Sequence, residues 1–255
     1  MKPIDPKQTT DTLVDFLTSC FQKAGFTSTV IALSGGVDSA VSCALAVRAL
    51  GADSVYPVLL PYGALSMQGT LDAMSVIEAL KIPPAHVTRF DIKPIVDPLI
   101  SKDPGMDNVR KGNAMARMRM LILFDQAKKR KALVTGTENK TEHILGYYTR
   151  FGDEASDIEP LRGLYKTQVY VVAKHLRLPD VILSRTPTAG LWEGQTDEGE
   201  FGFSYKDADD ILCLNFDEKK SPEEIVAAGF AKDLVDRVLA RVAANDFKHH
   251  LPLLP

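Results

Sequence analysis

The sequence predicts an α/β fold, a doubly wound and mostly parallel sheet with helices on both faces. Apolar segments of strand length, rich in β-branched residues, alternate along the chain with longer segments of helical pattern. Polar or glycine-containing segments directly follow three of the expected strands, at Leu33, Leu60 and Thr135. Ligands bind such sheets outside the carboxyl ends of the strands, so we expect these three segments to converge on one crevice.

Each element has its own signal along the chain. A leading helix is expected over Thr10–Ala24. The expected strands, each a short apolar run, are Thr29–Leu33, Val55–Leu60, Val87–Ile92 and Ala132–Thr135. The expected helices that lie between or after them are Ser39–Leu50, Gln68–Leu80, Asn113–Lys129 and Thr167–Leu176. Internal repeats, low-complexity tracts and Gly/Ser/Pro-rich linkers are absent, so a single domain over residues 1–255 is expected.

Composition narrows the classes of protein. The 255 residues are 45% hydrophobic and 25% charged, as in ordinary soluble domains, and the net charge of −3 argues against a nucleic-acid partner. Apolar runs stay far below the roughly 20 residues of a membrane span, and the N-terminus lacks the apolar centre of a signal peptide. Cys20, Cys43 and Cys213 are widely separated, which is typical of free thiols in a reducing compartment. We therefore expect a cytoplasmic protein.

The segment Leu33–Ser39, with sequence LSGGVDS, has the pattern of a strand, a glycine loop and a helix start. Two adjacent glycines let backbone N–H groups approach a ligand, and the helix start adds partial positive charge, which together suit phosphate oxygens. Ser34 and Ser39 offer hydroxyl donors. The Asp38 carboxylate beside phosphates makes sense mainly if a divalent cation lies between them. The alternative is a tight turn with a serine cap, which seldom needs both glycines.

This loop differs from the common nucleotide motifs GxxxxGK[ST] and GxGxxG. The pattern SGGxDS resembles instead the pyrophosphate loop of the ATP pyrophosphatases, which cleave ATP between its α- and β-phosphates.

A second polar cluster, Thr135–Glu142, directly follows the fourth expected strand. We expect Thr137 to cap a helix there, and Glu142 to project toward the crevice that also holds Asp38. Two carboxylates would then hold one Mg²⁺. A capping pattern without a ligand is the alternative, and the first loop favours the metal.

The expected helix Asn113–Lys129 carries two further candidates. Asn113 and Arg117 are four residues apart and so share one helix face, where together they suit a phosphate or carboxylate. The basic run Lys128–Lys131 falls at the helix end, where cations complement the dipole, so we interpret it as solvated. This helix is also a candidate for an interface between two copies of the chain, with a core role equally open.

Six motifs in order resemble the NAD synthetase family: SGGVDSA, NAMARMRM, GTENKTE, GYYTRFGDEASDIEPL, LYKTQV and PTAGLWEGQTDEGEFGFSY. The resemblance runs from about Val30 to Tyr205 and returns near Lys248. It implies an adenine nucleotide alpha-hydrolase-like, Rossmann-like fold and the amidation of nicotinic acid adenine dinucleotide (deamido-NAD). Other adenylating ligases share only the first motif, and a non-catalytic ATP-binding module would lack the carboxylates Asp38 and Glu142, so both alternatives are less favoured.

The resemblance assigns roles residue by residue. Asp38 and Lys166 are catalytic, and Asp38 with Glu142 ligates Mg²⁺. ATP is contacted by Ala32, Leu33, Ser34, Gly35, Gly36, Val37, Asp38, Ser39, Thr137, Lys166 and Thr188. The dinucleotide is contacted by Asn113, Arg117, Arg150, Asp157 and Lys248. Two residues depart from the family's usual pattern, since Arg150 stands where members often have Lys, and Phe247 where many have His.

The chemistry that the resemblance implies has two steps. ATP with Mg²⁺ activates the nicotinate carboxylate as an acyl-adenylate and releases pyrophosphate, and ammonia then attacks to give NAD and AMP. Glutamine-dependent members carry an additional glutaminase domain of some hundreds of residues, which this sequence does not include, so we expect free ammonia to be the substrate. A homodimer is also implied.

The glycine-rich segment Pro187–Glu200 has little periodicity and predicts a long mobile loop. Such a loop suits a lid that shields an acyl-adenylate from water, the alternative being a plain surface crossover. Asp197 and Glu198 are weaker candidates for directing ammonium or accepting its proton.

Overall fold

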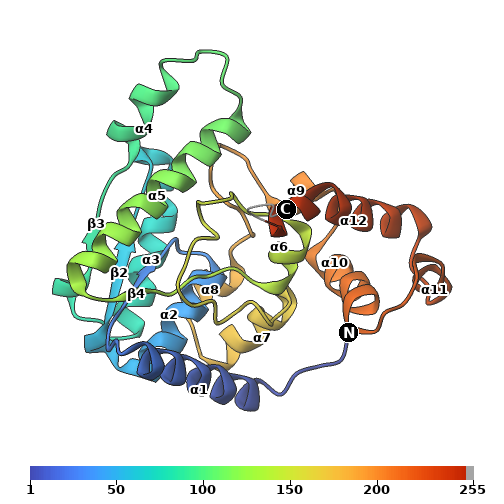
Figure 1. Ribbon diagram of the computed structural model, residues 1–255, viewed down its shortest axis with the longest axis horizontal. Coiled ribbons are helices and arrows are strands. Elements are labelled where there is room, and N and C mark those ends of the chain that lie inside the picture. The colour runs from blue at the N-terminus through green and yellow to red at the C-terminus, as the bar shows by residue number, and fades with distance from the viewer. Residues whose placement is uncertain (251–255) are drawn as a thin grey trace.

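The computed structural model describes residues 1–250 and has a parallel sheet at its centre (Figure 1). Its strands are β1 (Thr29–Ala32), β2 (Val55–Leu59), β3 (Thr88–Arg89) and β4 (Leu133–Val134), in the order β3-β2-β1-β4. Thr29 pairs with Val55 on one side and with Leu133 on the other, so the carboxyl ends of the central strands lie at one edge.

Helices cover both faces of this sheet, as alternation of side chains along the strands requires. Ile31 and Leu59 pack on one face, while Val30 and Val58 pack on the other. The first face is covered by α1 (Pro6–Ala24), α2 (Val37–Leu50), α3 (Met67–Ala79), α7 (Lys166–His175) and α8 (Asp180–Ser184). The second is covered by α4 (Lys93–Ile100) and α5 (Asn108–Arg130). The doubly wound α/β prediction is therefore confirmed.

A second group of helices lies beyond the sheet, on the right of Figure 1, and has an apolar core of its own. It consists of α6 (Lys140–Leu145), α9 (Asp197–Phe201), α10 (Tyr205–Leu212), α11 (Pro222–Ala227) and α12 (Lys232–Asn245). Short 3₁₀ segments occupy residues 52–54, 63–66, 84–86 and 246–249, and a π turn occupies residues 213–217. The sequence did not predict this helical group, apart from a helix start before Glu142.

The element boundaries differ from the predictions mainly at strand and helix ends. The expected strand Val87–Ile92 is only two residues long, because α4 begins at Lys93 and the chain turns into it. The leading helix starts earlier than expected, at Pro6, where Asp5 accepts hydrogen bonds from the N–H groups of Lys7 and Gln8. It ends at Ala24 as predicted, and the next residue, Gly25, caps it with a left-handed φ of 72°. Within residues 1–250, none of the helices combines the length and apolarity that crossing a bilayer requires.

Candidate active site

The phosphate loop connects β1 to α2, and its serine side chains fix its shape. The Ser39 hydroxyl accepts a hydrogen bond from the Ser34 N–H at 3.2 Å and donates to the Gly36 carbonyl at 3.1 Å. The Ser34 hydroxyl in turn accepts from the Gly36 N–H at 3.2 Å. No side chain caps the first turn of α2, whose preceding residue is Gly36. These helix N–H groups at the carboxyl edge of the sheet suit an anion.

Gly35 is required by both conformation and space. Its φ is 80°, a left-handed value that favours glycine. A Cβ atom there would lie 2.3 Å from the Gly69 carbonyl oxygen and 3.0 Å from the Asp72 Cβ. The loop therefore packs backbone to backbone on α3.

Three charged side chains meet below this loop. The Lys166 ammonium donates to Asp38 Oδ2 at 2.6 Å and to Glu142 Oε1 at 2.8 Å. The Lys166 side chain is only 4% exposed, and the carboxylates are 15% and 16% exposed. Asn139 donates to the other oxygen of Asp38 at 2.9 Å. Residues from the β1–α2 loop, α6 and α7 thus converge on one point, and the expected approach of Glu142 to the crevice that holds Asp38 is confirmed.

This arrangement controls the charge of its members. Burial alone would lower the pKa of Lys166, but the two carboxylates outweigh burial and raise that pKa above its usual value. Burial raises the pKa of the Glu142 carboxyl, while the Lys166 ammonium opposes the increase. Lys166 is therefore a fixed cation at the foot of the phosphate loop.

The segment over the crevice is tied to the same cluster through Asp197, which is 3% exposed. Asp197 accepts hydrogen bonds from the Tyr147 hydroxyl at 3.0 Å and the Tyr205 hydroxyl at 2.9 Å. The Tyr205 hydroxyl also lies 3.2 Å from Glu142 Oε1. Burial raises the pKa of Asp197. Glu198, by contrast, lies outside the cavity lining and accepts from the Tyr205 N–H at 2.8 Å.

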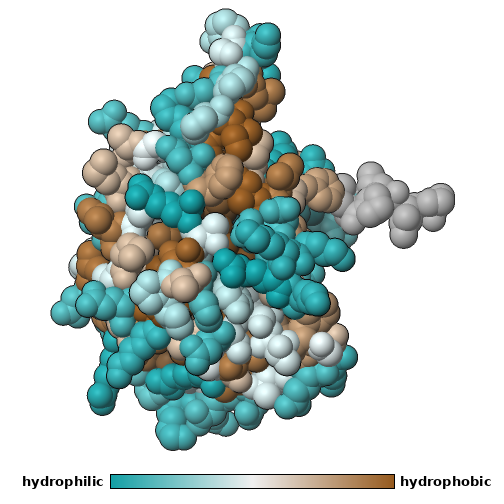
Figure 2. Space-filling model, turned by 90° about the vertical axis from the view of Figure 1, so that its left-hand side faces the viewer, coloured by the Kyte–Doolittle hydropathy of each residue, from teal (hydrophilic) through white to brown (hydrophobic). Residues whose placement is uncertain are grey.

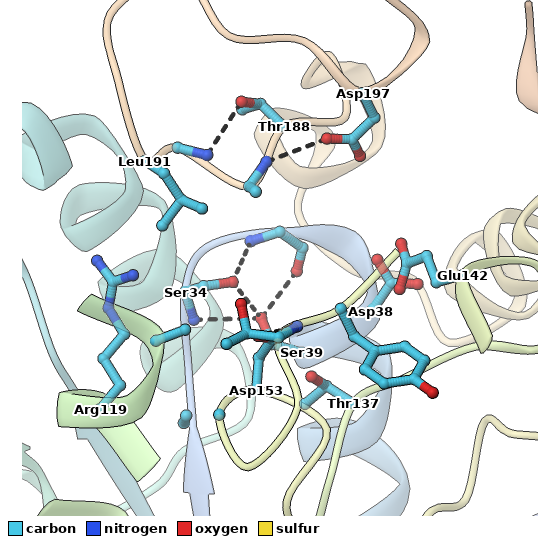
Figure 3. A pocket seen from close by; sticks show the side chains of 18 of the residues that line it. Ser34, Asp38, Ser39, Arg119, Thr137, Glu142, Asp153, Thr188, Leu191 and Asp197 are labelled. Carbon is cyan, nitrogen blue, oxygen red and sulfur yellow. Dashed lines mark hydrogen bonds between the residues drawn. The ribbon is translucent and has the colours of Figure 1, made fainter. Parts of the chain in front are cut away.

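A cavity of about 550 Å³ lies between the phosphate loop, α5 and the 186–200 segment (Figure 3). Residues that follow β1, β2 and β4 all line it, which confirms that the segments after Leu33, Leu60 and Thr135 converge on one crevice. Its walls carry both signs of charge. The cations are Arg119, Lys166, Arg185, Arg241 and Lys248, and the anions are Asp38, Glu142, Asp153, Asp197 and Glu200. A cavity lined by both cationic and anionic side chains suits a polyanionic ligand that binds together with a metal cation.

The cavity is lined by most of the residues to which the sequence assigned a site role. These are Ala32, Leu33, Ser34, Gly36, Val37, Asp38, Ser39, Asn113, Thr137, Glu142, Lys166, Thr188 and Lys248. Gly35 shapes the loop from behind. Asn113 accepts a hydrogen bond from the Thr149 hydroxyl at 2.7 Å, and Lys248 donates to the carbonyls of Gly146 and Tyr148 at 2.5 and 3.0 Å.

Three predicted substrate residues lie outside this cavity. Arg117 borders a separate surface hollow and donates to the Arg150 carbonyl at 3.2 Å. The Arg150 guanidinium lies 5.0 Å from the centre of the Phe247 ring. Asp157 accepts from the Val134 N–H at 2.7 Å and so closes the free edge of β4. The chain described here does not bring these three side chains to the phosphate loop.

Arg119 also lines the cavity, a position that was not predicted from the sequence. Its Nε donates to the Leu60 carbonyl at 3.1 Å, and Figure 3 shows its guanidinium beside Leu191. Burial lowers its pKa to about 10. The helical period could have indicated this position. Arg119 lies three residues after Ala116 and four before Leu123, so the three share a helix face, and all of them line the cavity.

Two local predictions were wrong. The residue that caps α6 is Asn139 rather than Thr137, since the Asn139 side chain accepts from the Glu142 N–H at 3.0 Å. The helix starts two residues later than expected, and Thr137 is left in the cavity wall.

The segment Pro187–Glu200 is also not irregular throughout, because α9 begins at Asp197 with Thr196 as its cap. The remainder is held by side-chain bonds. The Thr188 hydroxyl donates to the Gln195 carbonyl at 2.7 Å, and the Gln195 amide oxygen accepts from the Leu191 N–H at 2.7 Å.

Curated proteins resemble this chain over nearly its full length. The chain is 41% identical to the NH₃-dependent NAD⁺ synthetase of Fusobacterium nucleatum over 248 residues, which cover 97% of this chain and 95% of that protein. It is 43% identical to the protein of the same name from Pelodictyon phaeoclathratiforme, with 96% and 87% covered.

Solved structures give the same result. NMN synthetase from Francisella tularensis has a TM-score of 0.86 at 36% identity, and 99% of each chain is covered. NH₃-dependent NAD synthetase from Campylobacter jejuni has a TM-score of 0.82 at 28% identity, with 99% of this chain and 100% of that chain covered. The family model described as NAD synthase matches residues 9–252. The chain therefore belongs to the NAD synthase family and is an enzyme of the ligase class.

Proposed function

We propose that the chain amidates deamido-NAD with ammonia and ATP, through an acyl-adenylate, and releases NAD, AMP and pyrophosphate. The observation that carries the proposal is the position of Lys166, between Asp38 and Glu142 at the foot of a phosphate loop. The curated relatives bear the name of NH₃-dependent NAD⁺ synthetase, which supports the choice of substrates.

Adenylation makes a poor electrophile reactive. A carboxylate resists attack because of its charge, whereas a mixed anhydride with AMP has a good leaving group. In the proposed step, a nicotinate oxygen attacks the α-phosphorus, and the bond to the bridging oxygen of pyrophosphate breaks. The loop N–H groups and the Lys166 ammonium are placed to stabilise the charge that develops on pyrophosphate.

The donor set fits Mg²⁺. Asp38 and Glu142 already converge on one cation, the Lys166 ammonium, and the described residues contain no cluster of three ligating side chains. Mg²⁺ is commonly held by one or two carboxylates, with phosphate oxygens and waters completing six ligands. We infer that Asp38 and Glu142 would hold it. When bound, the ion would neutralise phosphate charge during pyrophosphate departure.

Water must be kept from the intermediate, and the 186–200 segment is placed to do so. It covers the cavity, and its bonds from Thr188 to Gln195 and from Tyr147 and Tyr205 to Asp197 hold it over the charged cluster. Two carboxylates of this segment, Asp197 and Glu200, line the cavity. Asp197 is the one bonded to the Tyr205 hydroxyl, which also contacts Glu142, and we infer that Asp197 accepts the proton that ammonia loses on forming the amide.

A direct assay tests the proposal. The purified chain is incubated with deamido-NAD, ATP and Mg²⁺, with either ammonium or ammonia-free glutamine as the nitrogen donor. We expect NAD, AMP and pyrophosphate in equal amounts with ammonium and almost none with glutamine. Comparable rates with both donors would overturn the ammonia assignment, and ADP in place of AMP would overturn the adenylate.

A second candidate substrate is the mononucleotide, nicotinic acid mononucleotide. The likeness to NMN synthetase from Francisella tularensis, at a TM-score of 0.86, favours testing it. The same assay with the mononucleotide in place of deamido-NAD decides between them. A kcat/KM for the mononucleotide above that for deamido-NAD would assign the shorter substrate.

We also propose a cytoplasmic homodimer. Cys20, Cys43 and Cys213 are free thiols, as a reducing compartment requires. Apolar side chains gather on the face that carries α4 and α5 (Figure 2), where Leu99, Val109 and Leu121 are 54%, 59% and 59% exposed. Analytical ultracentrifugation tests the dimer, and a monomer at micromolar concentration would contradict it.

A further inference from the structure

Asp209, on α10, is a carboxylate that the proposed reaction does not use. It is 1% exposed and lies outside the cavity lining. Its Oδ1 accepts from the Thr141 hydroxyl at 2.5 Å, and its Oδ2 accepts from the Thr167 N–H at 2.8 Å and the Thr167 hydroxyl at 2.6 Å. We propose that Asp209 is a positioning residue, which holds Lys166 and Glu142 in the geometry that the ligase reaction needs.

The first contact of Asp209 is with the start of α7, the helix that begins at Lys166. The residue before it, Tyr165, makes no side-chain cap, and its hydroxyl donates to Asp217 at 3.0 Å. Free N–H groups at a helix start need acceptors, and these come from elsewhere in the chain. The Lys166 N–H donates to the Thr141 hydroxyl at 2.8 Å, and the Thr167 N–H donates to Asp209. Asp209 and Thr141 thus cap α7 from outside.

The second contact is with α6, the helix that carries Glu142. Thr141 is the residue before Glu142 and donates to Asp209 while accepting from the Lys166 N–H. One buried carboxylate therefore fixes the starts of both helices relative to each other. The distance between the Lys166 ammonium and Glu142, 2.8 Å, depends on that spacing. Buried, charge-assisted hydrogen bonds are short and directional, so they suit this role.

The neighbouring carboxylate provides a matched contrast. Asp210 pairs with the N-terminal amine at 2.8 Å, and its side chain is 29% exposed. It is on the same helix and has the same charge, but it touches neither α6 nor α7 through any hydrogen bond described here. Replacing it removes an acidic residue of α10 without changing the spacing of the two helices.

This inference rests on the proposed function, so the test first establishes NAD formation by the unmodified chain. Asp209→Asn and Thr141→Val should then lower kcat about tenfold to a hundredfold, because a displacement near 1 Å in a reacting group has effects of that size. The KM for deamido-NAD should stay within about threefold, since Asn113 and Lys248 lie elsewhere in the cavity. Thr141→Ser, which keeps the hydroxyl, and Asp210→Asn should keep kcat within about twofold.

A binding readout separates this inference from the proposed function. Calorimetry with magnesium pyrophosphate should show affinity about tenfold weaker for Thr141→Val, but unchanged for Thr141→Ser and Asp210→Asn. If the unmodified chain forms no NAD, the function fails and the binding series still decides the role of Asp209. If Asp209→Asn does not fold, the Thr141 pair decides. Equal kcat and equal affinity in Thr141→Val and Thr141→Ser would overturn the proposal.

Discussion

The phosphate loop and the contacts between α6, α7 and α10 are held in shape by different means. Inside the loop, the Ser34 and Ser39 side chains bond each other across five residues of sequence. Between α6, α7 and α10, Asp209 bonds Thr141 across 68 residues and Thr167 across 42. The loop is thus specified by its own short motif, whereas the helical group depends on tertiary packing. This difference explains why the phosphate loop could be predicted from the sequence and the contacts of Asp209 could not.

The charged cluster joins the two regions. Lys166 begins α7 and Asp38 belongs to the loop, 128 residues earlier, yet the Lys166 ammonium lies 2.6 Å from Asp38 Oδ2. Substitutions at this junction should affect the chemistry most. Those in the loop should affect nucleotide binding and stability together, and those at the periphery of the helical group should affect stability only.

The largest expected effect comes from Asp38→Asn, which removes the charge that faces Lys166. Asn keeps the shape and can still bond Asn139, so we expect a folded protein. Turnover should fall about 10²–10³-fold, the usual cost of losing one preorganised charge at a site of phosphate chemistry. Steady-state assay at saturating ATP and Mg²⁺ measures this loss.

Asp53→Asn, at an exposed carboxylate in the 3₁₀ turn after α2, provides the control and should be silent. Near-normal turnover in Asp38→Asn would rule out the role assigned to Asp38.

A smaller but broader effect is expected from Gly35→Ala. The positive φ and the 2.3 Å approach to the Gly69 carbonyl oxygen oppose any side chain there. The free energy of unfolding should fall by about 1–3 kcal/mol, and the KM for ATP should rise because the loop must move off α3. Denaturant unfolding and initial rates measure both. Gly163→Ala, where nothing lies within 4 Å of the added Cβ, is the matched control. Equal stability of the two variants would show that the loop tolerates the side chain.

The same distinction between local patterns and tertiary contacts explains which features could be predicted from the sequence. The positions of the four strands, of α1, α2, α3, α5 and α7 and of the phosphate loop were predictable because each depends on a local pattern, although β3 is much shorter than expected. The Asn139 cap of α6 was missed because Thr137 and Asn139 are both good capping residues, and only the position of the helix selects one. Arg119 was missed because Arg117 shares a helix face with Asn113 and was chosen for that reason, and only the face of α5 that meets the sheet decides which arginine lines the cavity. Asp209 had no local signal, since its partners lie on other helices.

A moderate effect is expected at the segment over the cavity. Leu191 packs on α5 where Gly112 leaves room, since a Cβ at Gly112 would lie 2.7 Å from Leu191 Cδ1. We expect limited proteolysis to cleave residues 191–200 several-fold more slowly when ATP and deamido-NAD are bound. Gly112→Ala should reduce that protection, although alanine favours the helix. Cleavage at one rate with and without ligands would contradict a lid, and unchanged protection in Gly112→Ala would show that Leu191 does not need the space.

The smallest expected effect lies at the periphery of the helical group, at Asp217. Its carboxylate accepts from the Lys140 ammonium at 2.6 and 2.8 Å and from the Tyr165 hydroxyl at 3.0 Å. Burial would raise the pKa of this carboxyl, but these bonds outweigh burial and lower it below the ordinary value of 3.8. A carboxyl with a lowered pKa in the folded state contributes stability above its unfolded value and loses that contribution as the pH falls through its folded value.

Asp217→Asn should therefore destabilise the protein by about 0.2–1 kcal/mol at pH 7, the range for a pair whose carboxylate is 42% exposed. The difference from the unmodified chain should shrink as the pH falls from 3.8 through the lower pKa of the folded state, below which both proteins carry a neutral side chain at this position. Urea unfolding at pH 7 and near pH 3 measures it, with Asp15→Asn, an exposed carboxylate of α1, as the control. Turnover should not change, since Asp217 is outside the cavity lining. A large loss of turnover with little loss of stability would mean that the periphery of the helical group also sets the geometry of Lys166, and the distinction between junction and periphery would have to be given up.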